Sequence, residues 1–463
     1  MTQPTLTFWG AAGTVTGSRF LVETDASRIL VDAGLYQGPR ELRQRNWEEF
    51  AVDPRTLDGV VLTHAHLDHC GYLPRLVRDG LDAPVLCTAE TAELAAIVLR
   101  DSARLQEEDA AYATEAGFSK HDPALPLYDE RDVERTLPLL RPVPLHDDVP
   151  LTEDSLVTLR SAGHILGATS VLVDAAGSRA LFSGDLGRPG HPLVPRRENP
   201  PEADVVVVES TYGDRTHPAP PGGPADDVLA DAIRRTVARG GSVLVPAFAI
   251  DRTELVLLRV GELMTSGAVP TVPVHLDSPM ALRALDVYRR ALAGVDPRLL
   301  PPGWDVETFG VPDLRIVRSA DESVALNTPR QPCVIISASG MATGGRVVHH
   351  LAHQLGDARN CVVLTGYQAV GTRGRALLEG AREVKMHGRY VPVRAEVVND
   401  PEFSVHADAD EVLEWLSRCP SPPRAVYAVH GEPQAARALA DRVTDELGWL
   451  AVVPRFGERV RLD

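Results

Sequence analysis

Cysteine is scarce in this chain of 463 residues, and no two cysteines form a CxxC pair. The five stand far apart, at Cys70, Cys87, Cys333, Cys361 and Cys419. A small, odd and scattered set argues against a disulfide framework and for a reducing compartment. We therefore expect a cytoplasmic protein without disulfide bonds.

Long apolar runs are also missing. No run approaches the roughly 20 residues that a membrane helix needs. The first ten residues, MTQPTLTFWG, lack the basic segment and the long apolar core of a signal peptide. The sequence thus predicts neither a membrane partner nor a secretory leader.

Positive charge is in short supply, because 64 acidic residues outnumber 47 basic ones and leave a net charge of −17. Lysine occurs only at Lys120 and Lys385, so nearly all the basic charge is arginine. Arginine suits bidentate phosphate contacts, although biased codon usage would give the same composition. A protein of this charge that binds nucleic acid has to concentrate its positive charge locally.

The order of the expected elements indicates an α/β protein with an insertion. Short strands fill the first third, and Asp204–Val208 is a valine-rich strand of the kind covered on both faces. Strands then alternate with helices, which predicts a parallel sheet. The helices expected there are Asp251–Thr265, Met280–Leu292, Gly345–Leu355 and Arg373–Glu379. From about Tyr390 the chain returns to strand–helix–strand, a C-terminal piece that would complete the first domain.

The strongest motif in the chain is His64-Ala65-His66-Leu67-Asp68-His69, directly after the strand Gly59–Thr63. In extended chain, residues i and i+2 point the same way, so His64 and His66 can meet one metal ion. Asp68 and His69 can turn toward a second ion. A polar loop of hydrogen-bonded histidines is the alternative, and four ligand-type residues in six disfavour it.

Three further residues at strand ends extend this motif: Asp32, His164 and Asp185. Each is followed closely by a glycine-containing turn, and alone each would be interpreted as a turn or cap residue. Together with the histidine motif, in this chain order, they resemble the successive motifs of the metallo-β-lactamase fold. That resemblance implies an αββα sandwich with its metal ions at one edge.

The resemblance also implies a ligand set. One zinc ion would be held by His64, His66, His164 and Asp185. The second would be held by Asp68, His69 and the shared carboxylate of Asp185. Asp32 would hold a ligand or its loop in place from behind.

Three downstream motifs resemble those of the β-CASP nucleases, the branch that contains the pre-mRNA 3′-end-processing endonuclease and stand-alone bacterial and archaeal RNases. They are Glu209-Ser210-Thr211-Tyr212-Gly213, Phe403-Ser404-Val405-His406-Ala407-Asp408 and Val429-His430-Gly431-Glu432. Val405 departs from the pattern, in which alanine is usual. The resemblance implies a metallo-β-lactamase domain made of residues 1–211 and 389–463, with an inserted β-CASP domain at 212–388.

Roles for the new residues follow from the same resemblance. His430 would complete the second zinc site, and a histidine rather than a valine there is the RNA-cleaving pattern. His406 would be the general acid, oriented by Glu209, while Asp68 and Asp32 complete the catalytic set. Taken singly, Glu209 and His406 would be ordinary residues at a strand end and a helix start.

Segments rich in small residues follow strands of the inserted domain at 247–253, 337–346 and 365–375. Such segments let backbone N–H groups approach a phosphate, but a glycine-rich βα turn is more often only a turn. These resemble β-CASP segments that line the RNA channel. The substrate-contact candidates are Arg252, Ser337, Arg346 and Tyr367.

A second group of histidines, His349, His350 and His353, has helical spacing and could meet a metal ion on one helix face. The sequence indicates no carboxylate partner for it. We therefore interpret this group as an exposed or packing cluster.

The resulting hypothesis is a dizinc ribonuclease, with manganese as an alternative metal, that cuts single-stranded RNA in a cleft between the domains. It would leave 5′-phosphate and 3′-hydroxyl ends, most simply as an endonuclease, and the family resemblance allows a homodimer. The alternatives are a 5′→3′ exoribonuclease, a DNA nuclease, a thioester or lactone hydrolase, and a non-catalytic RNA-binding subunit.

Overall fold

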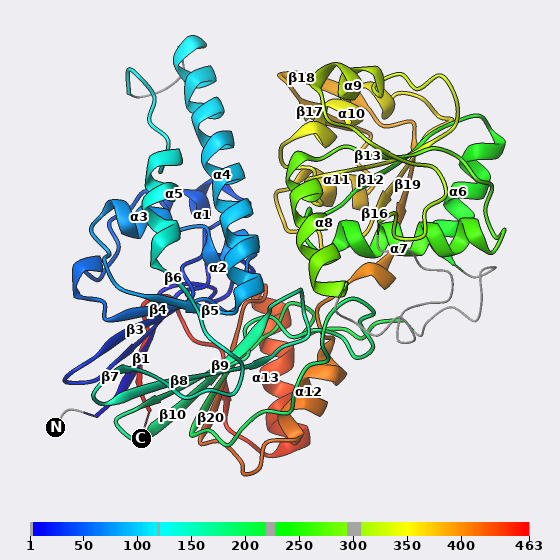
Figure 1. Cartoon of the computed structure of the whole chain (residues 1–463). Coiled ribbons are helices and arrows are strands. Elements are labelled where there is room, and N and C mark those ends of the chain that lie inside the picture. The colour runs from blue at the N-terminus through cyan, green and yellow to red at the C-terminus, as the bar shows by residue number, and fades with distance from the viewer. Residues whose placement is uncertain (1–2, 118–120, 219–226, 294–306, 463) are drawn as a thin grey trace. The chain divides into compact units, whose positions relative to one another are not determined.

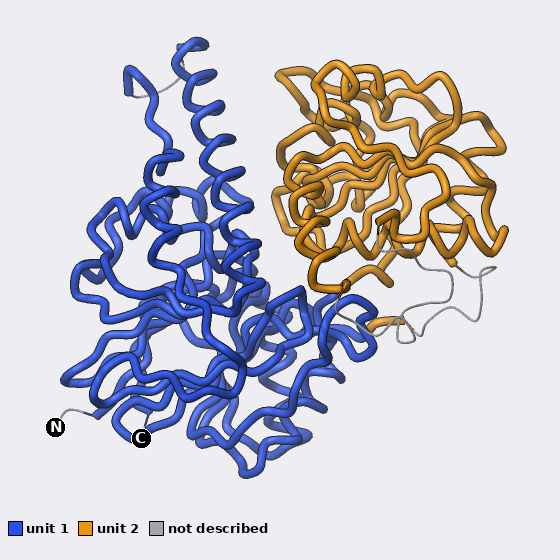
Figure 2. The backbone as a smooth tube through the Cα atoms, viewed as in Figure 1, with its two compact units in different colours: residues 1–216, 405–463 blue, residues 217–404 orange. Residues whose placement is uncertain are grey.

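The computed structural model describes residues 3–117, 121–218, 227–293 and 307–462. These residues form two compact units. Unit 1 contains residues 1–216 and 405–463, and unit 2 contains residues 217–404 (Figure 2).

Unit 1 is built on two seven-stranded sheets. The first has the order β22-β1-β2-β3-β4-β5-β6, formed by Arg459–Arg461, Thr5–Phe8, Phe20–Glu23, Arg28–Val31, Gly59–Val61, Val85–Cys87 and Leu140–Pro142. The second has the order β21-β20-β11-β10-β9-β8-β7, formed by Ala451–Val452, Ala425–Val429, Val205–Glu209, Ser178–Phe182, Thr169–Ala175, Ser155–Ser161 and Val149–Thr152. The first and last strands of the chain, β1 and β22, pair antiparallel, so the two ends of the sequence share one sheet.

The two sheets pack face to face over an apolar core that includes Phe8 and Phe20 from the first and Phe182 and Tyr427 from the second. Their outer faces carry helices (Figure 1). On the first sheet these are α1–α5, formed by Arg40–Gln44, Leu67–Cys70, Leu73–Arg78, Ala89–Glu115 and Glu130–Thr136. On the second they are α12 (Ala409–Ser417) and α13 (Pro433–Leu447). The predicted αββα sandwich is confirmed.

The valine strand β11 lies inside the second sheet, parallel to both β10 and β20. All five of its residues are buried because the inner face meets the sandwich core and the outer face meets α12 and α13. A strand covered on both faces has no use for polar alternation, which explains its run of valines.

Unit 2 has a six-stranded sheet of order β14-β13-β15-β12-β16-β19, in which every pairing is parallel. The strands are Leu314–Ile316, Val274–Leu276, Val334–Ser337, Val243–Pro246, Cys361–Leu364 and Glu396–Asn399. The helices α6–α11 are Val228–Ala238, Arg252–Thr265, Pro279–Leu292, Ala320–Ala325, Arg346–Gln354 and Arg373–Leu378. A separate hairpin is formed by β17 (Glu383–Met386) and β18 (Arg389–Pro392). The parallel α/β insertion expected from the alternating pattern is confirmed.

Within the described ranges, no helix is both long and apolar enough to span a bilayer.

Candidate metal centre

The histidine motif begins where β4 ends and continues into the short helix α2. His66 is the N-cap of α2, and Asp68 and His69 lie in its single turn. The chain therefore changes from extended to helical within the motif. His64 and His66 precede that change, and Asp68 and His69 follow it. The motif can therefore supply two neighbouring groups of donors.

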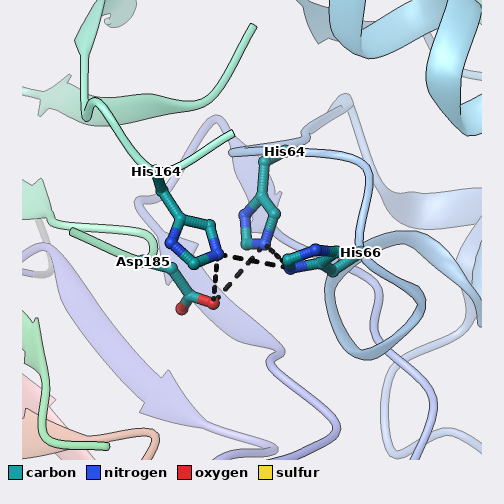
Figure 3. A group of neighbouring side chains, drawn as sticks. All are labelled: His64, His66, His164 and Asp185. Carbon is teal, nitrogen blue, oxygen red and sulfur yellow. Dashed lines mark hydrogen bonds and ion pairs between the residues drawn. The ribbon is translucent and has the colours of Figure 1, made fainter. Parts of the chain in front are cut away.

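The first group consists of His64, His66, His164 and Asp185, each with a ligand atom within 4.8 Å of the others (Figure 3). His64 Nε2 lies 3.0 Å from His66 Nδ1, and His164 Nε2 lies 3.3 Å from the same atom. Asp185 Oδ2 faces both His64 Nε2 at 3.5 Å and His164 Nε2 at 3.6 Å. Three ring nitrogens and one carboxylate oxygen thus point at a common centre.

The second group consists of Asp68, His69 and His430, again within 4.8 Å of one another. His430 Nε2 is 3.2 Å from His69 Nε2 and 3.4 Å from Asp68 Oδ2. The other carboxylate oxygen of Asp185, Oδ1, lies 3.3 Å from His69 Nε2 and 3.8 Å from His430 Nδ1. Asp185 therefore presents one oxygen to each group.

Asp32 holds the second group from behind. Its Oδ2 lies 2.7 Å from His69 Nδ1, which leaves Nε2 of that ring to face Asp185. Its Oδ1 accepts a hydrogen bond from the Thr63 backbone N–H at 2.8 Å. Asp32 follows β3, and its left-handed backbone (φ 61°) turns the carboxylate back toward the motif.

Burial controls the charge state of the first group. It lowers the pKa of His64 and His164 well below the usual value for imidazole, and that of His66 to about 4. Burial opposes ionisation of Asp185, but the neighbouring His430, His69 and His64 hold the pKa of that carboxyl well below its usual range. Neutral imidazoles beside a carboxylate are the protonation states in which these side chains bind metal.

The donors present fit two metal ions. Three histidines and an aspartate form one group, and two histidines and an aspartate form the other, with the carboxylate of Asp185 between them. Imidazole nitrogen and carboxylate oxygen are the donors that zinc takes in hydrolytic sites. Asp185 Oδ1 and His164 Nδ1 are buried and make no hydrogen bond in the described part of the chain.

His406 and Glu209 meet beside this centre. His406 Nδ1 lies 3.2 Å from both carboxylate oxygens of Glu209 and 3.9 Å from Asp185 Oδ2. Glu209 is fixed in turn, because its Oε1 accepts the Leu186 backbone N–H at 2.7 Å. The side chain of His406 is 15% exposed, whereas Glu209 is buried, so the ring lies at the open side of the centre.

Two threonines complete the site, and motif reasoning did not single them out. Thr63 Oγ1 lies within 3.3 Å of His64 Nδ1, His69 Nδ1 and both oxygens of Asp32. Thr211 Oγ1 lies 3.1 Å from His430 Nδ1. Each stands beside a recognised motif residue, but a lone threonine gives no sequence signal that separates such a role from an ordinary strand residue.

The four substrate-contact candidates lie in unit 2, at or just after the carboxyl ends of three adjacent strands, β12, β15 and β16. Arg252 is buried and donates to the Thr365 carbonyl, whereas Tyr367 is half-buried. Ser337 Oγ donates to the Asp277 carbonyl at 2.8 Å, and Arg346 Nη1 donates to Asp277 Oδ1 at 2.6 Å. Ligands of parallel sheets bind at this edge.

The second histidine group does not converge. His350 is buried and lies 2.6 Å from Asp277 Oδ2, a carboxylate partner from a distant strand end that the local sequence did not reveal. His349 is exposed and stacks on His387, with ring centroids 4.3 Å apart. His353 is also exposed, and its Nδ1 lies 2.8 Å from the His349 carbonyl oxygen.

Models of known protein families match three stretches of this chain. Residues 12–235 match the metallo-beta-lactamase superfamily, and residues 253–377 match the Beta-Casp domain. Residues 390–454 match the Zn-dependent metallo-hydrolase RNA specificity domain. The third stretch includes both His406 and His430.

Individual relatives match over almost the full length. Ribonuclease TTHA0252 of Thermus thermophilus is 37% identical, and an RNase J-like protein of Methanocaldococcus jannaschii is 31% identical, each over 98% of both chains. Transcription termination factor FttA of the same archaeon is 29% identical over 95% of this chain and 68% of its own. A solved structure of a protein of unknown function from Enterococcus faecalis V583 shares the fold, with a TM-score of 0.51 at 12% identity over 99% of this chain and 100% of that one.

A sandwich of two sheets with histidine and carboxylate donors gathered at its strand ends defines a metallo-β-lactamase-fold protein. The parallel α/β insertion and the full-length relatives define the branch: the chain belongs to the β-CASP family.

Proposed function

We propose that this protein is a dizinc ribonuclease that hydrolyses phosphodiester bonds of single-stranded RNA by endonucleolytic cutting, leaving 5′-phosphate and 3′-hydroxyl ends. The observation that carries the proposal is the placement of Asp185, whose two oxygens face two separate groups of histidine and carboxylate donors. Phosphoryl transfer needs concentrated positive charge and an activated water, and two-metal sites provide both. The two relatives named as ribonucleases support RNA as the substrate.

We assign His64, His66, His164 and Asp185 to one zinc ion and Asp68, His69, His430 and Asp185 to the other. Two zinc ions held there would supply a water of lowered pKa and neutralise charge on the phosphoryl oxygens. Asp32 and Thr63 orient the rings of His69 and His64 by hydrogen bonds to their Nδ1 atoms. Fixed rings keep their remaining nitrogens aimed at the metal positions.

Protonation of the leaving 3′-oxygen is assigned to His406. Glu209 holds the ring by Nδ1, so Nε2 is the atom that donates to the departing oxygen. General acid help of this kind contributes about 10²–10⁴-fold to the rate. We assign contact with the substrate strand to Arg252, Ser337, Arg346 and Tyr367. We assign the inserted domain to residues 212–388.

The test is digestion of one RNA sequence, labelled separately at its 5′ and 3′ ends, with the ends of the products mapped. Internal fragments bearing 5′-phosphates, produced at similar rates from 5′-hydroxyl and 5′-monophosphate RNA, are expected. The same preparation is assayed on a DNA strand of equal sequence and on a panel of thioesters and lactones.

The outcomes separate the candidates. Stepwise release of mononucleotides from the 5′ end would replace the endonuclease by a 5′→3′ exonuclease. Equal cutting of DNA would widen the substrate to both nucleic acids. Thioester or lactone turnover without cutting of RNA would overturn the proposal.

A further inference from the structure

The β17–β18 hairpin of unit 2 is unusually basic for this protein. Residues 381–395 contain four cations and a single acid, Glu383, whereas the whole chain has a net charge of −17. One of the cations, Lys385, is one of only two lysines in the chain. The hairpin is therefore a local reversal of the overall charge, which is what RNA binding by an acidic protein requires.

All four cations reach solvent. Lys385 and Arg389 lie on the hairpin strands, while Arg382 and Arg394 flank its base, where the Val393 N–H donates to the Arg382 carbonyl at 2.8 Å. In the described part of the chain none of them forms an ion pair with an acidic side chain, although most other arginines of unit 2 do. Their charges are thus available to a ligand.

The hairpin also exposes an aromatic ring, beside one of these cations. Tyr390 is 66% exposed and lies directly opposite Lys385 in the antiparallel register, so the two side chains share one face. Glu383, two residues before Lys385, lies on that same face. The opposite face carries Val384 and Met386, which are buried in the core with α10 and α11, and Arg389, which pairs with Met386 and is exposed next to the turn. An aromatic ring beside cations is the arrangement that single-stranded nucleic acid uses for stacking and phosphate contact.

The hairpin is firmly anchored. His387 in its turn stacks on His349 of α10, beside the hairpin in Figure 1. Arg373 donates through Nε to the Lys385 carbonyl at 3.0 Å and through Nη1 to the Thr343 carbonyl at 3.0 Å. The exposed side chains therefore project from a backbone that is fixed to the rest of unit 2, which reduces the ordering that binding requires.

We propose that the basic hairpin surface, made of Arg382, Lys385, Arg389, Tyr390 and Arg394, binds single-stranded RNA. The four cations contact phosphates, and a base stacks on the Tyr390 ring. None of these five residues is among those assigned to the metal centre or to substrate contact. The RNA that the surface binds is the substrate of the proposed function, on which this inference rests.

The test measures binding of a fluorescent 30-nucleotide single-stranded RNA to the zinc-loaded full chain, with His406→Ala in every variant so that the RNA stays intact. The logarithm of the RNA-binding constant falls as the logarithm of the salt concentration rises, and each phosphate contact to a single strand makes this fall steeper by roughly 0.7. The double variant Lys385→Ala with Arg389→Ala should make this dependence on salt shallower by about 1.4. It should also weaken RNA binding about 25-fold at 0.1 M salt. Tyr390→Ala should weaken binding at least about fivefold, and Tyr390→Phe should not, because the ring is what stacks.

The matched control is Arg315→Ala with Arg359→Ala, which removes the same charge from exposed ion pairs elsewhere on unit 2. It should change binding less than twofold. Equal weakening by the control would show that net charge alone matters and would overturn the inference. Unchanged binding by the hairpin variants would also overturn it, as would loss of binding by Tyr390→Phe equal to that of Tyr390→Ala.

Failure of the surface and failure of the ribonuclease are distinguishable. With His406 restored, turnover of the small diester bis-p-nitrophenyl phosphate should be the same in hairpin variants and wild type, since it is too small to need the surface. If wild type cuts RNA while hairpin variants bind it normally, the surface is wrong and the function stands. If hairpin variants lose binding while wild type leaves RNA uncut, the function is wrong and the surface stands.

Discussion

At the scale of single residues, each buried charge of the metal centre is matched by a neighbour from another part of the chain. The carboxylate of Asp32 meets His69 and Thr63, that of Glu209 meets His406 and the Leu186 N–H, and that of Asp185 lies among histidines. A buried carboxylate without a partner raises the free energy of the folded state. Removing one member of such a pair therefore leaves the other buried and unpaired, which is destabilising. Activity should therefore depend on the partners as well as on the ligands.

The His406–Glu209 pair offers the first prediction. His406→Ala should lower kcat on RNA about 10²–10⁴-fold while both zinc ions remain, because it removes only the proposed proton donor. Glu209→Gln should give a smaller loss, since glutamine still accepts from Leu186 N–H but turns an amide toward Nδ1 of His406. Single-turnover rates with metal analysis by mass spectrometry measure both. Full activity of zinc-loaded His406→Ala would remove its role as acid.

Asp400 of unit 2 offers a prediction about pH. It is buried, and burial raises its pKa to about 7. The folded chain then keeps a proton that the unfolded chain releases near pH 4, so stability falls as pH rises toward 7. Between pH 5.5 and 8 the wild type should lose about 2 kcal/mol more stability than Asp400→Asn, which still caps the Glu402 N–H. Urea unfolding at each pH measures this, and parallel pH profiles would refute it.

At the scale of elements, the metal centre depends on loops that follow neighbouring strands. The Asp32 loop after β3 pairs with the helix turn after β4: the Ala33 N–H donates to the His69 carbonyl at 2.7 Å and the Leu35 N–H to the Leu67 carbonyl at 3.0 Å. Because β3 and β4 are parallel neighbours, their carboxyl ends reach the same edge. The spacing of Asp32 from the histidine motif is thus set by the sheet.

Gly34 allows the close contact between these two loops, because it has no side chain. Substituting it gives the prediction for this scale. A Cβ on Gly34 would lie 1.6 Å from the Asp68 carbonyl oxygen, so Gly34→Ala must push the ligand loop away. We expect weaker zinc binding and at least about 1–3 kcal/mol lower stability, as overpacking gives. Gly356→Ala, where a Cβ meets nothing within 4 Å, is the control and should behave as wild type. Normal zinc affinity of Gly34→Ala would contradict the expectation.

At the scale of the whole molecule, the residues assigned to the zinc ions and to acid catalysis all belong to unit 1, although they come from both ends of the sequence. Residues 32–209 and 406–430 meet there because β20 joins the second sheet beside β11. Unit 2 has its own parallel sheet and its own core. Metal binding should therefore stabilise one unit and leave the other unchanged.

Calorimetry of the full chain tests this. Zinc at 1,000 times its dissociation constant should stabilise unit 1 by about 4 kcal/mol per site. Chelation is thus expected to lower one unfolding transition by several degrees and to leave a second one in place. Asp185→Asn, which removes the shared ligand, should make the first transition insensitive to chelator. A chelator shift of both transitions together would show that the units unfold as one.

The sequence by itself determined the local parts of this protein. Period and composition predicted the buried valine strand and the alternating strands and helices of unit 2, and the structure confirms them within a few residues, for example Asp251–Thr265 against Arg252–Thr265. The histidine motif marked its own chemistry because its ligands are adjacent in the chain. These features are visible because they depend on neighbours a few residues apart.

Only the tertiary structure decided which distant groups meet. Thr63 contacts Asp32, His64 and His69. Asp277 contacts Arg346 and His350. These contacts join separate parts of the chain, and no local sequence pattern encodes them. The same holds for charge: composition gave only a net −17, whereas within the described residues folding leaves Lys385 and Arg389 without acidic partners, in a hairpin that also exposes Tyr390. Partnering in space, rather than composition, determines where an acidic protein can meet an anion.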